Sequence, residues 1–238
     1  MICVEQRNLI AESVVARKRS RRPTPGPELA LVEKFLTSNC LPSPAAHQEL
    51  TVFIEPWVES GYPDLVAVYW DRTKVERWPQ ARLKLTKSDL RLAHYLYVVQ
   101  PTCIVDLTEI FGKSVTKSLQ RLMDAELLLA QSGTVALRPF EDIFAIERLV
   151  AIEAKVTNWK EGLCQAVQNT WFASESYLLL PKVPNNQGLI ERARELGIGL
   201  LELNSHFDCG STFARKETFP QSHGCWYFNE WLAIAEPS

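Results

Sequence analysis

Hydrophobic and polar positions follow two different periods in the first third of the chain. Residues 27–38 carry apolar side chains at helical spacing, and Pro27 suits the first turn of a helix. Residues 51–55 are rich in β-forming side chains. Residues 64–70 (DLVAVYW) form an almost continuous apolar run, which is typical of a strand covered on both faces. The pattern therefore predicts a helix followed by two strands.

Apolar patterns typical of strands and helices in alternation return after residue 139. The pattern predicts a strand within residues 145–156, a helix over 159–173, a strand over 177–180, a helix over 188–196 and a strand over 198–203. Gly197 follows the second helix, as glycine commonly does at a helix C-terminus. The aromatic residues beyond 203 fit no single element. Together with the first three elements, this order predicts an α/β fold with a mixed central sheet flanked by helices.

Residues 85–138 lie between these two regions and show a mainly helical pattern. Helices are predicted over residues 90–99, 105–111 and 113–127, with a break at Gly112, and residues 127–137 form a hairpin around Ser132-Gly133. A short helix, a tight turn, a further helix and a β-hairpin in this order resemble a winged helix-turn-helix. We therefore expect an inserted winged-helix domain.

The third predicted helix of this segment has two distinct faces. Val115, Leu119 and Leu122 form an apolar stripe that would pack inward. Another face offers polar and cationic side chains for phosphate and base-edge contacts in the major groove of DNA. Its members are Lys113, Ser114, Thr116, Lys117, Gln120 and Arg121. Winged helices also serve protein contacts, and the hairpin tip (131–134) holds no cation, so protein binding is the alternative.

Two carboxylates and a lysine would meet if the predicted strands pair. Asp64 lies where a loop enters a strand, and Glu153 and Lys155 lie two apart in the strand AIEAKV, so they share a face. Carboxylates bind Mg²⁺ or Mn²⁺, and a lysine beside them stabilises developing charge during phosphodiester hydrolysis. Both motifs adjoin strongly apolar runs, where buried charges need partners or a purpose. A structural ion pair is the alternative interpretation.

These motifs resemble the core of the PD-(D/E)xK nucleases. The stretches that carry the resemblance are GYPDLVAVYW, AIEAKVTNWKEGLCQAVQN, SESYLLLP and LGIGLLEL, over roughly residues 27–70 and 140–203. The resemblance implies a restriction-endonuclease-like fold in which Asp64 and Glu153 bind metal and Lys155 is the catalytic lysine. It also implies that Gln165 lies near the site. Family members often carry an acidic residue on the first helix, for which Glu33 is the first choice and Glu28 the rival.

The chain departs from the family in the long stretch between Asp64 and Glu153, which the inserted segment accounts for, since an insertion at a hairpin tip leaves a sheet intact. The expected organisation is a basic N-terminal arm over 1–26, a discontinuous nuclease-like domain over 27–84 and 139–238, and the insert over 85–138. The arm holds Arg17, Lys18, Arg19, Arg21 and Arg22. It is either a solvated segment or a phosphate-contacting arm.

Composition limits the remaining function classes. The formal net charge of −2 gives no global preference for nucleic acid, so binding must come from local patches. The six cysteines never form a CxxC pair, which favours a reducing, cytoplasmic location. A zinc site built from His206, Cys209, His223 and Cys225 has irregular spacing, so packed or exposed side chains are the better interpretation. No apolar stretch approaches the length of a membrane span, and neither a GxSxG elbow nor a nucleotide-binding glycine motif is present.

The sequence therefore predicts a metal-dependent endonuclease that uses Mg²⁺ or Mn²⁺ and binds nucleic acid, with DNA as the first choice and no membrane partner. A non-catalytic DNA-binding regulator and an interaction subunit of a larger assembly are the alternatives. A homodimer remains open, because cutting two strands commonly demands two active sites.

Overall fold

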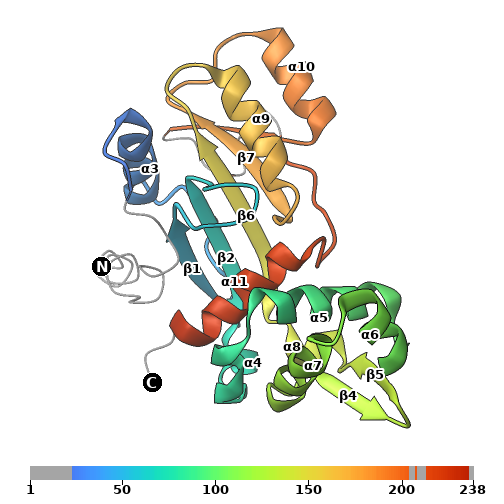
Figure 1. Ribbon diagram of the computed structural model, residues 1–238. Helices are drawn as coiled ribbons and strands as arrows, with labels where there is room; N and C mark the ends of the chain where they lie inside the picture. Colours follow the sequence, from blue (N-terminus) through green and yellow to red (C-terminus); the bar gives the residue numbers. More distant parts are fainter. Residues whose placement is uncertain (1–22, 204–206, 208–212, 236–238) are drawn as a thin grey trace.

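A computed structural model describes residues 23–203, 207 and 213–235 of the chain. Its centre is a mixed five-stranded sheet in the order β1-β2-β6-β7-β8 (Figure 1). The strands are β1 (Gln48–Ile54), β2 (Leu65–Asp71), β6 (Ile146–Ala154), β7 (Glu175–Leu180) and β8 (Gly199–Glu202). β1, β2 and β6 pair antiparallel, and β6, β7 and β8 pair parallel. The predicted mixed α/β sheet flanked by helices is confirmed.

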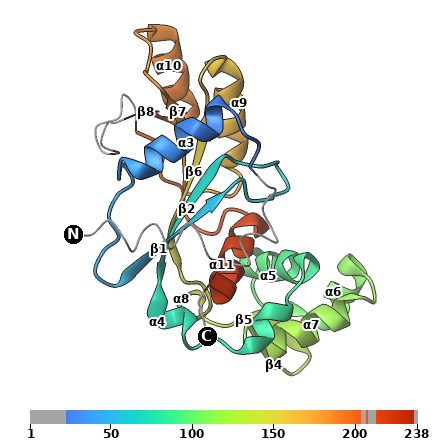
Figure 2. The ribbon, with the colours of Figure 1, turned by 90° about the vertical axis from the view of Figure 1, so that its left-hand side faces the viewer.

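Helices cover both faces of this sheet (Figure 2). α3 (Pro27–Thr37) packs on one face, where Leu31, Val32 and Phe35 join the side chains of β2, β6 and β7. α9 (Trp159–Asn169), α10 (Gln187–Leu196) and α11 (His223–Ala235) cover the other face. α9 ends earlier than the sequence predicts, because residues 170–172 form a turn. α11 lies in the aromatic stretch that the sequence pattern did not assign.

The segment 85–138 forms a separate group of elements between β2 and β6. It contains α5 (Lys87–Val99), β3 (Thr102–Cys103), α6 (Ile104–Phe111), α7 (Val115–Asp124), β4 (Leu128–Gln131) and β5 (Thr134–Leu137). The predicted hairpin gains β3 as a third strand, in the order β3-β5-β4. α7 is shorter than predicted: the chain reverses at Gly112, whose φ of 75° favours glycine, and Glu126 adopts a φ of 56° beyond its other end.

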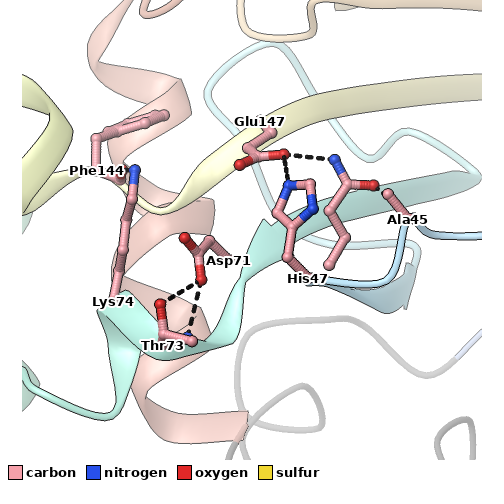
Figure 3. A network of polar contacts seen from close by, with 8 residues as sticks. Ala45, His47, Asp71, Thr73, Lys74, Phe144 and Glu147 are labelled. Carbon is pink, nitrogen blue, oxygen red and sulfur yellow. Dashed lines mark hydrogen bonds and ion pairs between the residues drawn. The ribbon is translucent and has the colours of Figure 1, made fainter.

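Short helices connect this segment to the sheet at the end where β2 stops and β6 starts. They are α4 (Arg72–Val75), η1 (Gln80–Lys84) and α8 (Phe140–Ile143). The amide of Asp71 donates to the carbonyl of Ala145 over 3.0 Å, which holds the two connections side by side. Figure 3 shows the polar contacts here: Asp71 caps α4 by accepting from the amide of Thr73 over 2.9 Å, and Glu147 bonds to His47 over 3.1 Å.

One apolar core joins the 85–138 segment to the sheet. Leu96 and Leu119 of the segment belong to the same buried cluster as Trp70 of β2 and Trp226 of α11. At the same end of the sheet, Asn229 of α11 accepts from the amide of Ala145, just before β6, over 2.8 Å. The segment is therefore packed against the sheet and is not held by its connections alone.

Several sequence-based expectations fall outside the described residues, namely the basic arm's Arg17, Lys18, Arg19, Arg21 and Arg22, together with His206 and Cys209. Within the described residues, Cys40, Cys103, Cys164 and Cys225 are free thiols. None of the helices that the structure describes combines the length and apolar character that crossing a membrane requires.

Candidate active site

The pairing of β2 with β6 brings Asp64 beside Glu153. Leu65 pairs with Ile152, so Asp64, one residue before β2, stands level with Glu153. Asp64 Oδ2 accepts from the amide of Ala154 over 2.8 Å, and the carbonyl of Asp64 accepts from the amide of Glu55 over 3.1 Å. Asp64 is therefore fixed at the end of the strand, where it is half-buried.

Lys155 lies at the same end of the sheet, on the face that α9 covers. Its amide donates to the carbonyl of Leu179 over 2.9 Å, which extends the β6–β7 ladder past Ala154. A Cβ added to Gly162 of α9 would lie 2.4 Å from Lys155 Cγ. The absence of a side chain at Gly162 thus allows α9 to pack on the lysine stem. Glu153 and Lys155 are only 3% and 8% exposed, so the expectation that these charges are buried is confirmed.

The acidic residue that reaches the cluster from α3 is Glu28. Lys155 Nζ lies 3.1 Å from Glu28 Oε1. Glu33, the first choice from the sequence, is exposed, and no contact within the described residues joins it to the cluster. The reason is helical geometry: Glu28 begins α3 next to the sheet's end, whereas Glu33 follows the buried Val32 and turns to solvent. Of the two glutamates that the sequence offers, Glu28 is thus the one that contacts Lys155.

Burial raises the pKa of both carboxyl groups. The pKa of Glu153 rises to about 8, first because burial disfavours the charged form and second because Asp64 is close. Burial also raises the pKa of Asp64, although the amide of Ala154 and the charge of Lys155 oppose this. A Glu153 carboxyl with this pKa is largely protonated at neutral pH.

The charge of Lys155 is maintained by its neighbours. Burial lowers the pKa of its ammonium, but the hydrogen bond and charge of Glu28, together with the charges of Glu153 and Asp64, raise that pKa overall. The lysine therefore stays protonated through the neutral pH range.

α9 adds two polar side chains, one of which the sequence did not indicate. Asn169 is buried, and its Nδ2 donates to Glu153 Oε2 over 3.3 Å. Gln165 stands one helical turn earlier, and its Oε1 is buried without a hydrogen-bond partner among the described residues. Asn169 follows Gln165 by four residues, so the two share a face of the helix. This spacing could have predicted that Asn169 lies near the site.

The two carboxylates fit a hard divalent cation. Mg²⁺ is commonly held by one or two carboxylates, with water and substrate in the remaining positions, and Asp64 and Glu153 supply that number. The buried Gln165 oxygen, which lacks a donor, is a further polar atom on the helix beside the cluster. Among the described residues, no group of three or more His, Cys, Asp or Glu side chains is arranged to hold a metal. A cation at this place would therefore have the Asp64–Glu153 pair as its carboxylate ligands.

The cationic face predicted on α7 is only partly free. Lys113, Ser114, Thr116, Lys117 and Gln120 are exposed. Arg121 instead forms two hydrogen bonds of 2.7 Å to Asp89, which is fully buried in α5. Breaking this bidentate pair would leave a buried carboxylate without its partner. Arg121 thus holds α7 to α5, and Lys113 and Lys117 remain as the cations of this face.

The described members of the candidate zinc group make other contacts. His223 Nε2 lies 2.9 Å from Glu59 Oε2, in a cluster where Arg91 and Tyr227 also bond to Glu59. Cys225 is buried, and its thiol donates to the carbonyl of Phe172 over 3.0 Å. These two side chains are therefore packed within the fold, and the other two members of the group lie outside the described residues.

A polar cavity of about 360 Å³ lies at the junction between the sheet and the 85–138 segment. Its charged lining consists of Lys74, Arg77, Arg82 and Arg138 with Asp71, Glu126, Glu141 and Asp142. Because cations and carboxylates are equal in number, the cavity offers no preference for a charged ligand.

Comparison with known proteins assigns no family. No protein-family model matches the chain, and no curated protein resembles it. Among solved structures, the chain is similar to the crystal structure of protein VC1899 from Vibrio cholerae, with 12% identity over 70% of this chain and a TM-score of 0.21. The match spans 56% of that protein's length. A likeness this weak supports no argument about fold family or activity.

Proposed function

We propose that this chain is a divalent-metal-dependent nuclease with a PD-(D/E)xK-like core. The observation that carries the proposal is the cluster of Asp64, Glu153 and Lys155 at one end of two paired strands, buried and with raised carboxyl pKa values. A structural ion pair needs one carboxylate for one lysine. Here Glu28 already pairs with Lys155, so Asp64 and Glu153 are left as an excess of acid that a cation would balance.

The roles of the side chains follow from their contacts. Asp64 and Glu153 would hold Mg²⁺ or Mn²⁺, which when bound supplies the Lewis acidity that phosphodiester hydrolysis needs. Lys155 is kept charged by Glu28 and would stabilise negative charge developing on the phosphate. Asn169 donates to Glu153 and orients it, and Gln165 lies on the same face of α9.

We further propose that the 85–138 segment is a winged-helix insert that binds DNA through α7. The order α5, α6, α7 and a three-stranded sheet supports this, as does the exposure of Lys113 and Lys117. Because Arg121 is bonded to Asp89, two cations of this face stay available for phosphate contacts. Their polar neighbours are Ser114, Thr116 and Gln120.

The deciding experiment is a cleavage assay on plasmid and single-stranded DNA with Mg²⁺ or Mn²⁺. Wild type is compared with Glu153→Ala and Lys155→Ala, and with Glu191→Ala and Lys34→Ala, which remove exposed charges on α10 and α3. We expect cutting that requires metal and falls at least about a hundredfold in the first two variants only. Equal activity in all five proteins, or none in folded wild type, would refute the proposal.

A second candidate is an interaction subunit that uses the same segment to bind protein. It is favoured by large apolar side chains exposed on α6 and β4, where Val105, Ile110 and Leu129 are 63%, 56% and 55% exposed. Absence of DNA binding, together with a stable complex lost on substituting Val105 and Ile110, would favour this candidate.

A further inference from the structure

The carboxylate–lysine cluster and the cationic face of α7 lie at opposite ends of the β2–β6 pair. Asp64 immediately precedes β2 and Lys155 immediately follows β6, so the cluster lies at one end. The 85–138 segment is attached at the other end, where Trp70 pairs with Ile146. Figures 1 and 2 agree that α7 lies beyond this second end, whereas α9 lies near the first.

The length of β6 gives the scale of the separation between the two places. The strand runs from Ile146 to Ala154, and a strand rises about 3.3 Å per residue, so its ends are about 26 Å apart. In duplex DNA this length corresponds to about eight base pairs at about 3.4 Å each. A phosphate bound by Lys113 or Lys117 therefore cannot be the phosphate that is cut.

The separation is fixed because the segment is packed rigidly on the sheet. Leu119 of α7 and Trp70 of β2 belong to one buried cluster. Two contacts also tie α5 to the loop that leads into Asp64: Arg91 Nη2 bonds to Glu59 Oε1 over 2.7 Å, and Lys87 Nζ lies 3.1 Å from the centre of the Trp57 ring. Neither end can move alone without breaking these contacts.

We infer that the substrate is a DNA duplex long enough to span both places, cut at a constant offset of about eight base pairs or more from the bases that α7 contacts. This inference rests on the proposed nuclease function. By this inference, α7 determines the position along the duplex at which the cluster cuts. Duplexes too short to reach α7 are not bound by its lysines.

The test is cleavage of end-labelled duplexes whose lengths run from roughly six to roughly thirty base pairs, with Mg²⁺ at low salt. Wild type is compared with a Lys113→Ala/Lys117→Ala double variant. A Lys34→Ala/Arg194→Ala double variant removes the same charge from exposed positions on α3 and α10. Both double variants are checked for folding by circular dichroism.

On long duplexes we expect kcat/KM to fall about tenfold in the α7 variant alone. The slope of log kcat/KM against log salt concentration should fall by the equivalent of about two phosphate contacts. On the shortest duplexes the difference in kcat/KM between the α7 variant and wild type should become much smaller than on the long ones. Cleavage that is independent of length, or an α7 variant equally impaired at all lengths, would overturn the constant offset while leaving the nuclease intact. No cleavage of any duplex by wild type would overturn the proposed function, and this inference with it.

Discussion

At the scale of single residues, the surroundings of Glu153 constrain the chemistry most. Its side chain is 3% exposed, and burial together with the nearby charge of Asp64 raises its pKa to about 8. Without a cation, one carboxyl of the pair therefore holds a proton at neutral pH. Metal binding requires that this proton leave, so affinity for the metal should rise with pH until Glu153 is ionised.

The raised pKa of Glu153 predicts how the metal-free protein depends on pH. The folded state binds the proton more tightly than the unfolded chain, whose carboxyl keeps its usual pKa of 4.5. The resulting stabilisation is complete below about pH 4.5 and is lost as pH rises through about 8. Because one pKa unit is worth about 1.4 kcal/mol, the loss should reach a few kcal/mol.

Urea unfolding in EDTA at several pH values between about 5 and 8 measures this effect. The Glu153→Gln variant cannot ionise, so its free energy of unfolding should change much less with pH. Glu191→Gln, on the exposed surface of α10, is the matched control and should behave as wild type. Parallel curves for wild type and Glu153→Gln would show that burial does not raise this pKa.

Asn169 is predicted to position Glu153 for metal binding. Replacing it with leucine removes the amide that donates to Glu153 Oε2, so the carboxylate loses the bond that stabilises its charged form. We expect the affinity for Mn²⁺ to fall about tenfold to a hundredfold, with secondary structure unchanged. Isothermal titration measures this, with the exposed Gln168→Leu on the same helix as control. Equal affinity in the two variants would assign Asn169 a packing role only.

At the scale of elements, apolar periodicity was sufficient to predict the central sheet and its principal helices. A strand as apolar as residues 65–70 is expected only in the interior of a sheet, because both of its faces must be covered. The same reasoning failed for α11. Its apolar residues cover almost the whole helix, so they show no amphipathic period.

Side-chain partners across elements were beyond the reach of the sequence. Lys113, Lys117 and Arg121 share one spacing, yet Arg121 is taken by Asp89, which lies 32 residues earlier in the chain. Likewise, Glu28 and Glu33 are equally acidic residues of one helix, and only the way α3 packs on the sheet decides between them. Such choices depend on tertiary geometry and not on local pattern.

The packing of α9 against β6 is predicted to require glycine at position 162. The added methyl group of Gly162→Ala would lie 2.4 Å from Lys155 Cγ and 2.7 Å from Leu178 Cδ1, so the helix or the lysine must shift. Overpacking of this kind costs about 1–3 kcal/mol, which exceeds the gain in helix propensity. Gly188→Ala in α10 is the control, since its nearest neighbour is a side-chain oxygen at 3.3 Å. Urea unfolding that ranks Gly162→Ala as no less stable than Gly188→Ala would contradict this account.

At the scale of the whole molecule, the segment 85–138 separates β2 from β6 in sequence but is not an independent unit in packing. Its apolar residues share a cluster with β2 and α11. At the junction, Arg82 of η1 donates to the carbonyl of Ile143 over 2.7 Å and lies 3.5 Å from Glu230 of α11. Both charged side chains are buried, so the connection that leads into the segment excludes water where it packs on α11.

The shared core predicts a single cooperative unfolding transition in which the segment and the sheet unfold together. Tryptophan fluorescence, circular dichroism and calorimetry should report coincident transitions. Arg82→Ala should lower the free energy of unfolding by about 3–5 kcal/mol, because Glu230 then stays buried without its partner. Arg77→Ala, which removes an exposed arginine nearby, should cost far less. If the double variant Arg82→Leu/Glu230→Leu regains most of the stability that Arg82→Ala loses, the loss comes from the unpaired charge of Glu230. If the segment unfolds before the sheet in wild type, the unfolding is not cooperative. In that case the spacing between α7 and the cluster is not rigid either.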